Sequence, residues 1–198
     1  MKNKILLPVL AAAIPLIGSG CATNAHYVQT GGSESVVTIG QINIQDYIQA
    51  ANAATGDLLA SGALDRVATT PAVLAISRIV NNTGQQIDTD LLTKKIRVAL
   101  LQSGKAMTTT TMGLGGTAED PMAQGLQEEN AFKADVKNTR TPDFTLSGKI
   151  IELAVKAGNT SQSTYSFQLS LTDAKSGLAV WEGEKEITKQ GTRSSVGF

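Results

Sequence analysis

The stretch PAVLAISRIVNNTGQQIDTDLLTKKIRVALLQSGK, residues 71–105, contains the patterns of a strand, a turn and a helix in succession. From Ala72 to Val80, apolar residues occupy both alternating positions, which is typical of a central strand covered on both faces. The run NNTG at 81–84 predicts a turn. A strand followed by a turn and a helix favours an α/β fold, and the rest of the chain is read outward from this unit.

After the turn, the spacing of apolar residues is helical. Asp88 or Thr89 can cap the amino end of this helix, and Gly104 can end it. Apolar side chains that recur every three or four residues share one face, so we expect one buried stripe and one solvated face. The expected buried stripe is Leu92, Ile96, Ala99 and Leu100, and the expected solvated side chains are Thr93, Lys94, Lys95 and Arg97.

The flanking segments add further elements of both kinds. Upstream, the spacing predicts a helix over 43–61. Downstream, we expect a Thr-rich strand over 105–112, a loop over 113–117 and a helix over 118–134 with Pro121 in its first turn. These elements alternate with the strand at 72–80, as in other α/β domains.

The last third of the chain reads as an antiparallel meander. Strands are expected over 143–155, from Tyr165 to Thr172 and over 178–188. The adjacent Ile150 and Ile151 change the phase of the apolar pattern, which suggests a β-bulge. The whole sequence therefore predicts a single α/β sandwich domain, with a mixed sheet of about four or five strands, about three helices and a carboxy-terminal antiparallel meander.

The amino terminus has the pattern of a secretory signal. Two lysines, Lys2 and Lys4, precede an apolar run from Ile5 to Ile17, and small residues follow it up to Cys21. The run is shorter than the roughly 20 residues that span a bilayer. We therefore expect a signal peptide over 1–20, a flexible tether over 21–40 that is rich in Gly, Ser and Thr, a folded domain over 41–190 and a disordered tail over 191–198.

Cys21 and the small residues before it resemble a bacterial lipobox, in which the cysteine is acylated and becomes the new amino terminus. Gly18 departs from the pattern, because Leu, Val or Ile is usual at that position. The alternative is a plain signal peptide with an incidental cysteine. The resemblance implies that Cys21 carries lipid, and Ala22 after it implies sorting to the outer membrane, on the periplasmic face.

Two rare residues exclude whole classes of chemistry. The chain has one cysteine and one histidine, His26, and both precede the expected domain. That domain therefore lacks thiolate or imidazole metal ligands, a Cys nucleophile and a His general base. The 17 basic and 17 acidic residues leave no basic field for nucleic acid. We expect a protein that binds another protein, with no catalysis and no small-molecule substrate.

One motif points the other way. Residues 113–118, GLGGTA, fit the dinucleotide fingerprint, and Asp135 follows at a suitable distance. However, Glu119 and Asp120 would lie in the first turn of the following helix and repel a pyrophosphate there. We therefore expect no cofactor and interpret the motif as a glycine loop, with a nucleotide-dependent enzyme as the alternative.

The final strand carries a row of carboxylates. Glu182, Glu184 and Glu186 share one face, and we interpret them as the wet side of an edge strand, with a cation or a basic partner as the alternative. Trp181 lies on the opposite face by parity. Core packing is the expected role of Trp181, and an interface anchor is the alternative.

Several of these segments are similar to the LpoB family, outer-membrane lipoproteins that activate class A penicillin-binding proteins and share a related fold with CsgG and the TolB amino-terminal domain. The similarity rests on residues 71–84, on the helix that ends in Ser103-Gly104-Lys105 and on the late stretch LAVWEG at 178–183. It implies a partner among class A penicillin-binding proteins and a role in peptidoglycan synthesis. The alternative is a structural or assembly accessory of the outer membrane, similar to CsgG. The docking surface stays unknown, and a tether of about 19 residues reaches only about 60 Å.

Overall fold

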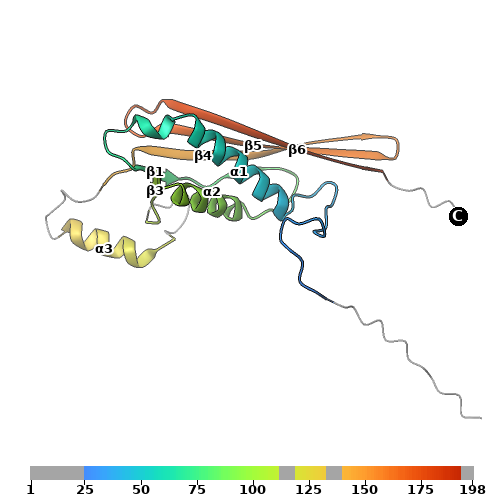
Figure 1. The fold of residues 1–198 in the computed structure, drawn as a ribbon, viewed down its shortest axis with the longest axis horizontal. Helices are drawn as coiled ribbons and strands as arrows, with labels where there is room; N and C mark the ends of the chain where they lie inside the picture. The colour runs from blue at the N-terminus through green and yellow to red at the C-terminus, as the bar shows by residue number, and fades with distance from the viewer. Residues whose placement is uncertain (1–24, 112–118, 133–139, 193–198) are drawn as a thin grey trace, which may run out of the picture.

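The computed structural model describes residues 25–111, 119–132 and 140–192 (Figure 1). No helix within these ranges is both long enough and apolar enough to cross a membrane. The elements, in chain order, are α1 (Ile44–Ala60), the short 3-10 helix η1 (Ala63–Arg66), β1 (Ala72–Ile76), β2 (Val80–Asn82), α2 (Asp90–Gln102), β3 (Ala106–Thr108), α3 (Pro121–Phe132), β4 (Phe144–Ala157), β5 (Thr160–Asp173) and β6 (Ala179–Thr192).

All the strands form one mixed sheet in the order β3-β1-β4-β5-β6, with β2 paired to β4 beyond the end of β1. The pairs among β1, β2, β3 and β4 are parallel, whereas β4, β5 and β6 form an antiparallel meander. This topology confirms the prediction of a single α/β domain with a carboxy-terminal meander.

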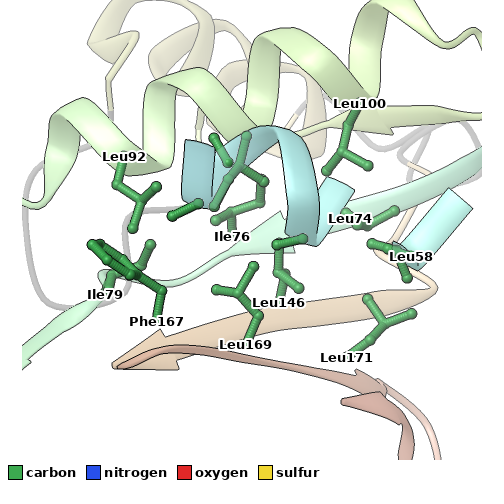
Figure 2. Close-up of a cluster of buried hydrophobic side chains, with 14 of the residues drawn as sticks. Leu58, Leu74, Ile76, Ile79, Leu92, Leu100, Leu146, Phe167, Leu169 and Leu171 are labelled. Atoms are coloured by element: carbon green, nitrogen blue, oxygen red, sulfur yellow. The ribbon is translucent and has the colours of Figure 1, made fainter. Parts of the chain in front are cut away.

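Two helices cover one face of the sheet. Helix α1 packs against α2 and β6, and the core between these helices and the sheet is mostly aliphatic. Leu92, Ile96 and Leu100 are buried as predicted, while Ala99 is half-buried. Figure 2 shows the side chains that meet in this core, among them Leu58, Leu74, Leu92, Leu100, Leu146, Leu169 and Leu171.

The predicted strand over 72–80 is wrong in its second half. Strand β1 is fully buried but ends at Ile76, and Ser77 then donates its backbone N–H to Leu146 O at 2.8 Å. After this break the chain pairs again with β4 as β2, where Val80 is exposed. Asn81 and Asn82 belong to β2, so the turn begins later than predicted.

The predicted bulge at Ile150 and Ile151 is also wrong. The β4–β5 register runs without a shift from Phe144 to Ala157, and the irregularity lies between β5 and β6 at Leu171. The phase of the apolar pattern changes because β4 extends past the helices. Its last buried side chain is Ile150, and the later apolar residues Leu153 and Val155 lie on the opposite face, 66% and 53% exposed.

Arg97, expected in solvent, is 7% exposed. It forms an ion pair with Glu119, and burial lowers the pKa of its guanidinium. Asp120 accepts the backbone N–H of Ala123 at 2.9 Å and so caps α3, a helix with no buried residue. The two carboxylates after the glycine motif thus have structural partners, while residues 113–118 and Asp135 lie outside the described ranges.

Candidate functional site

Cys21 and the expected signal peptide lie outside the described residues, so the proposed lipid site is not placed by the structure. What the structure does show is how the segment that follows joins the domain. Gln45 of α1 donates its side-chain amide to Gly32 O at 3.2 Å, and Ile42 donates its backbone N–H to Gln85 Oε1 at 3.0 Å. Contact between the segment before α1 and the domain therefore begins well before residue 41.

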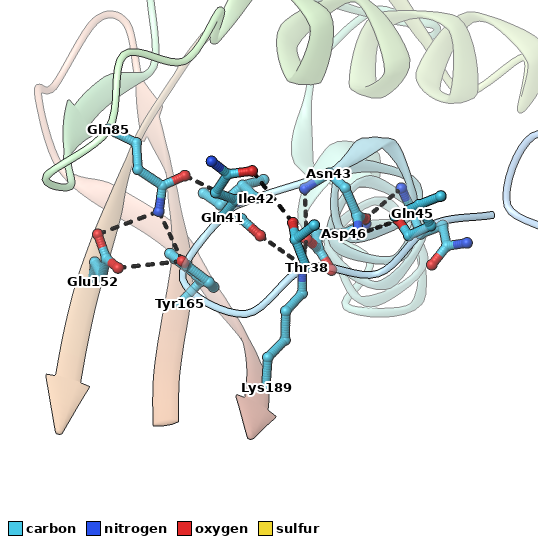
Figure 3. Close-up of polar contacts among 11 residues, drawn as sticks. Thr38, Gln41, Ile42, Asn43, Gln45, Asp46, Gln85, Glu152, Tyr165 and Lys189 are labelled. Carbon is cyan, nitrogen blue, oxygen red and sulfur yellow. Dashed lines mark hydrogen bonds and ion pairs between the residues drawn. The ribbon is translucent and has the colours of Figure 1, made fainter. Parts of the chain in front are cut away.

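A buried ion pair lies where this segment meets the sheet (Figure 3). Lys189 of β6 pairs with Asp46 of α1 and donates to Gln41 O at 2.7 Å. The two charged residues are 8% and 3% exposed, respectively. The Lys189 ammonium also lies 6.0 Å from the ring centre of Tyr165, within the range of a cation–π contact. One lysine thus connects the amino-terminal segment, the first helix and the last strand.

Asp46 has a second role in the local structure of α1. Its carboxylate accepts the backbone N–H of Asn43 at 2.8 Å, and the Asn43 side chain accepts the N–H groups of Gln45 and Asp46 at 3.1 and 3.3 Å. This capping box satisfies backbone donors that the first turn of a helix leaves without partners. The spacing Asn-x-x-Asp is readable in the sequence, whereas the pairing with Lys189 depends on the fold.

A second polar group lies beside the first. Tyr165 accepts a hydrogen bond from Gln85 Nε2 at 2.7 Å and donates its hydroxyl to Glu152 Oε1 at 3.2 Å, and Gly84 N–H donates to Glu152 Oε2 at 3.1 Å. Burial raises the pKa of the Tyr165 phenol; the nearby Glu152 charge adds to this rise, and the Gln85 hydrogen bond opposes it. Tyr165 is therefore a hydrogen-bond donor at neutral pH, not a base.

These two groups, which we call the junction network, fasten parts of the chain that are far apart in sequence. Sequence reasoning missed the network because its members looked like ordinary solvated or core residues. It comprises Gln41, Asp46, Gln85, Glu152, Tyr165 and Lys189. Each of its six residues hydrogen bonds to a neighbour in the fold, so its arrangement suits holding the segment in place.

The other face of the meander carries the predicted acidic row. Glu182, Glu184 and Glu186 are exposed there, and Gln168 and Ser166 donate side-chain hydrogen bonds to Glu184, which lower the pKa of its carboxyl group. A shallow groove of about 870 Å³ crosses this face, between Asn82 of β2, Lys149 of β4 and Glu184 of β6. The groove is open and shallow, and the outer end of the same face exposes Leu153 and Val155, which suits a protein partner better than an enclosed small ligand.

Trp181 packs against the core from the opposite face and is half-buried, which confirms the predicted core-packing role. A Cβ atom at Gly183 would overlap the Trp181 ring, so the ring lies directly over that glycine. The late LAVWEG stretch thus places its tryptophan inside and its glutamates outside.

Comparison with solved structures finds similar proteins at low sequence identity. The LpoB carboxy-terminal domain of Salmonella enterica is 17% identical, with a TM-score of 0.43, over 72% of this chain and 98% of that one. The LpoB carboxy-terminal domain of Escherichia coli is 15% identical, with a TM-score of 0.41, over 70% of this chain and 97% of that one. Lipoprotein GNA1162 of Neisseria meningitidis is 17% identical, with a TM-score of 0.40, over 64% of this chain and 88% of that one.

No curated protein sequence matches this chain. The sequence profile of the family described as peptidoglycan-synthase activator LpoB, however, matches residues 46–187. This range runs from the capping-box aspartate of α1 to Ile187 of β6, and so includes α2, every strand before β6, and most of α1 and β6. Because the match covers more than half of the chain, this protein belongs to the LpoB family.

Proposed function

We propose that this protein is a non-enzymatic activator of peptidoglycan synthesis that docks on a class A penicillin-binding protein. The observation that carries the proposal is the family match over 46–187, which spans the folded body. The chemistry of the body agrees with it. In the junction network Lys189 pairs with Asp46, and Glu152 accepts a hydrogen bond from Tyr165; the domain contains no histidine or cysteine.

We further propose that residues 1–20 are removed, that Cys21 carries lipid and that the domain of about residues 41–190, with a short tail after it, stands on the periplasmic face of the outer membrane. Gly32 already contacts α1, so the segment that can extend freely starts at Cys21 and ends near Gly32. At about 3.3 Å per residue, that segment reaches about 36 Å. The domain then stays close to the membrane, and the partner must approach it there.

For docking we propose the open face of β4, β5 and β6, because α1 and α2 occupy the other face. Its charge is set by Glu182, Glu184 and Glu186, with Lys149 at the other side of the groove. An acidic row on a flat surface attracts a basic surface and accelerates encounter at low salt. The partner's docking surface is then expected to be basic.

Two measurements test the proposed function. Affinity purification of the full chain from solubilised envelopes should recover a class A penicillin-binding protein. The purified full chain should also raise the rate of glycan polymerisation and cross-linking by that enzyme in a reconstituted reaction. The Glu184→Lys variant should weaken the stimulation, whereas Lys175→Glu, in the β5–β6 turn, should leave it unchanged.

The proposal fails if only outer-membrane components are recovered, or if the synthase rate is the same with and without the protein. Rings seen by electron microscopy of detergent-extracted material would instead favour the assembly accessory considered above as the alternative.

A further inference from the structure

The outer face of α2 is apolar and basic, and the fold leaves it uncovered. Leu91, Val98 and Leu101 lie there, seven and three residues apart on one side of the helix, and are 38%, 41% and 47% exposed. Lys94 and Lys95 lie between them, and neither lysine pairs with a carboxylate among the described residues. A helix face that meets only water is usually polar throughout, so this face suits a partner that is both apolar and acidic.

Helix α3 has the opposite character. Met122, Leu126 and Phe132 lie on one side of it and are 78%, 55% and 93% exposed, and no residue of the helix is buried. Its charged residues are Glu128 and Glu129, and it contains no basic residue. α3 therefore presents apolar side chains with negative charge, whereas α2 presents apolar side chains with positive charge.

The amino end of α3 is held at a different side of α2. Glu119 pairs with the buried Arg97, and Asp120 donates its backbone N–H to Thr110 O at 3.1 Å. These contacts fasten the start of α3 beside the buried side of α2 and the end of β3. Figure 1 shows α3 apart from the other helices and from the sheet. The outer face of α2 is thus not covered by the α3 of its own chain.

We propose that α3 of one chain packs on the outer face of α2 of a second copy. Two helices with matching apolar rows bury them by packing ridges into grooves, and opposite charges beside the rows favour the pairing. Glu128 and Glu129 then lie near Lys94 and Lys95 of the other chain. Glu128 accepts Gln124 Nε2 at 3.1 Å in the single chain, an exposed contact within one helix that is worth little. Because every chain carries both faces, two copies can make the contact twice.

The size of this contact sets the conditions under which it forms. Three apolar side chains on each helix make an interface at the low end of the known range, below roughly 1,200 Å², where association is usually weak. Dimers are therefore expected in concentrated protein and not at the dilute concentrations of an unfolding experiment. The contact uses no residue of the docking face proposed above, so it stands apart from activation of a synthase.

One variant distinguishes contact between chains from contact within a chain. It carries Cys21→Ser, Val98→Cys in the middle of the α2 face and Gly125→Cys in the middle of α3, where an added Cβ atom meets nothing within 4 Å. In concentrated solution a short-spacer bis-maleimide should join two such chains, seen as a dimer on a denaturing gel, and dilution should abolish the dimer. The matched control keeps Gly125→Cys but replaces Val98→Cys by Ala174→Cys, in the exposed β5–β6 turn, and should form about tenfold less dimer.

Exchanging the charges tests the pairing itself. Adding Lys94→Glu and Lys95→Glu to the double-cysteine protein should slow dimer formation about tenfold, because the acidic α3 then meets an acidic face. Adding Glu128→Lys and Glu129→Lys instead should slow it by a similar factor. All four changes together should restore the rate, a result that damage to either helix would not produce.

Three results would overturn the inference. The first is cross-linking within one chain, seen as a monomer that has gained one linker and kept no free thiol. The second is no more dimer than in the control, and the third is a four-fold variant that stays slow. None of them bears on stimulation of a synthase, which is measured with the chain that lacks these substitutions.

Discussion

Lys189 holds the buried half of the junction network, where it bonds to Asp46 and Gln41. In Lys189→Met the Asp46 carboxylate stays buried without its cation, and removing one member of a buried ion pair typically costs about 3–5 kcal/mol. We expect the free energy of unfolding, measured by urea denaturation, to fall by about 3 kcal/mol. The control is Lys175→Met in the exposed β5–β6 turn, which should change it by less than about 0.5 kcal/mol. Equal losses in both variants would show that the ion pair contributes nothing specific.

The two buried tyrosines, Tyr47 and Tyr165, make the stability of the protein depend on pH in the alkaline range. Burial raises the pKa of both Tyr47 and Tyr165, and nearby carboxylates add to each rise. The folded protein holds these protons longer than the unfolded chain does, so its stability falls as pH rises from the ordinary phenol value toward the raised one. An alkaline absorbance titration should show late-ionising phenols, and Tyr165→Phe should remove one of them. An unchanged late phase in that variant would contradict the assignment.

Single residues also mark the limit of what the sequence could predict. The buried stripe of α2 was predictable because it follows the helical period. Arg97 was not, because its burial depends on Glu119, which approaches from beyond β3. The same holds for Lys189 and Asp46, which lie far apart in the sequence and meet only in the fold.

The two helices that follow β1 should differ sharply in their sensitivity to truncation. Leu100 of α2 is fully buried, whereas Leu126 of α3 is exposed on a helix with no buried residue. Leu100→Ala should therefore lower the free energy of unfolding by about 2–5 kcal/mol, and Leu126→Ala by less than about 0.5 kcal/mol. Thermal denaturation followed by circular dichroism measures both. A large loss in Leu126→Ala would mean that α3 packs on the body in solution.

Helices and strands with a regular spacing of apolar residues were predicted well, whereas the point at which strand pairing is interrupted was not. The helix expected over 43–61 is α1, Ile44–Ala60, and the meander has the expected three strands. The apolar run from Ala72 to Val80, in contrast, is divided between β1 and β2, because the chain passes from one part of β4 to another. No local pattern encodes that step, since it depends on how far β4 extends.

Under the proposed anchoring, the position of the whole molecule in the cell depends on Cys21. If Cys21 carries the proposed lipid, Cys21→Ser should move the protein from the membrane fraction to the soluble periplasmic fraction. The melting temperature of the domain should stay within about 2 °C, since Cys21 precedes the segment that contacts it. Fractionation with immunoblotting, together with calorimetry of the purified variant, checks both. Membrane recovery equal to that of the unchanged chain would rule out the lipid as the anchor.

The way the amino-terminal segment is fastened also decides how a tethered domain would bear mechanical load. Under the proposed anchoring, tension on the lipid reaches the domain first at Gly32, which is bonded to Gln45 of α1, and then at Gln41 and Ile42, which are bonded to Lys189 and Gln85. The pull is then shared by the first turn of α1, by β6 and by the loop after β2. A membrane that bends or slides against the cell wall would therefore load three elements together, and no one of them would carry the whole force.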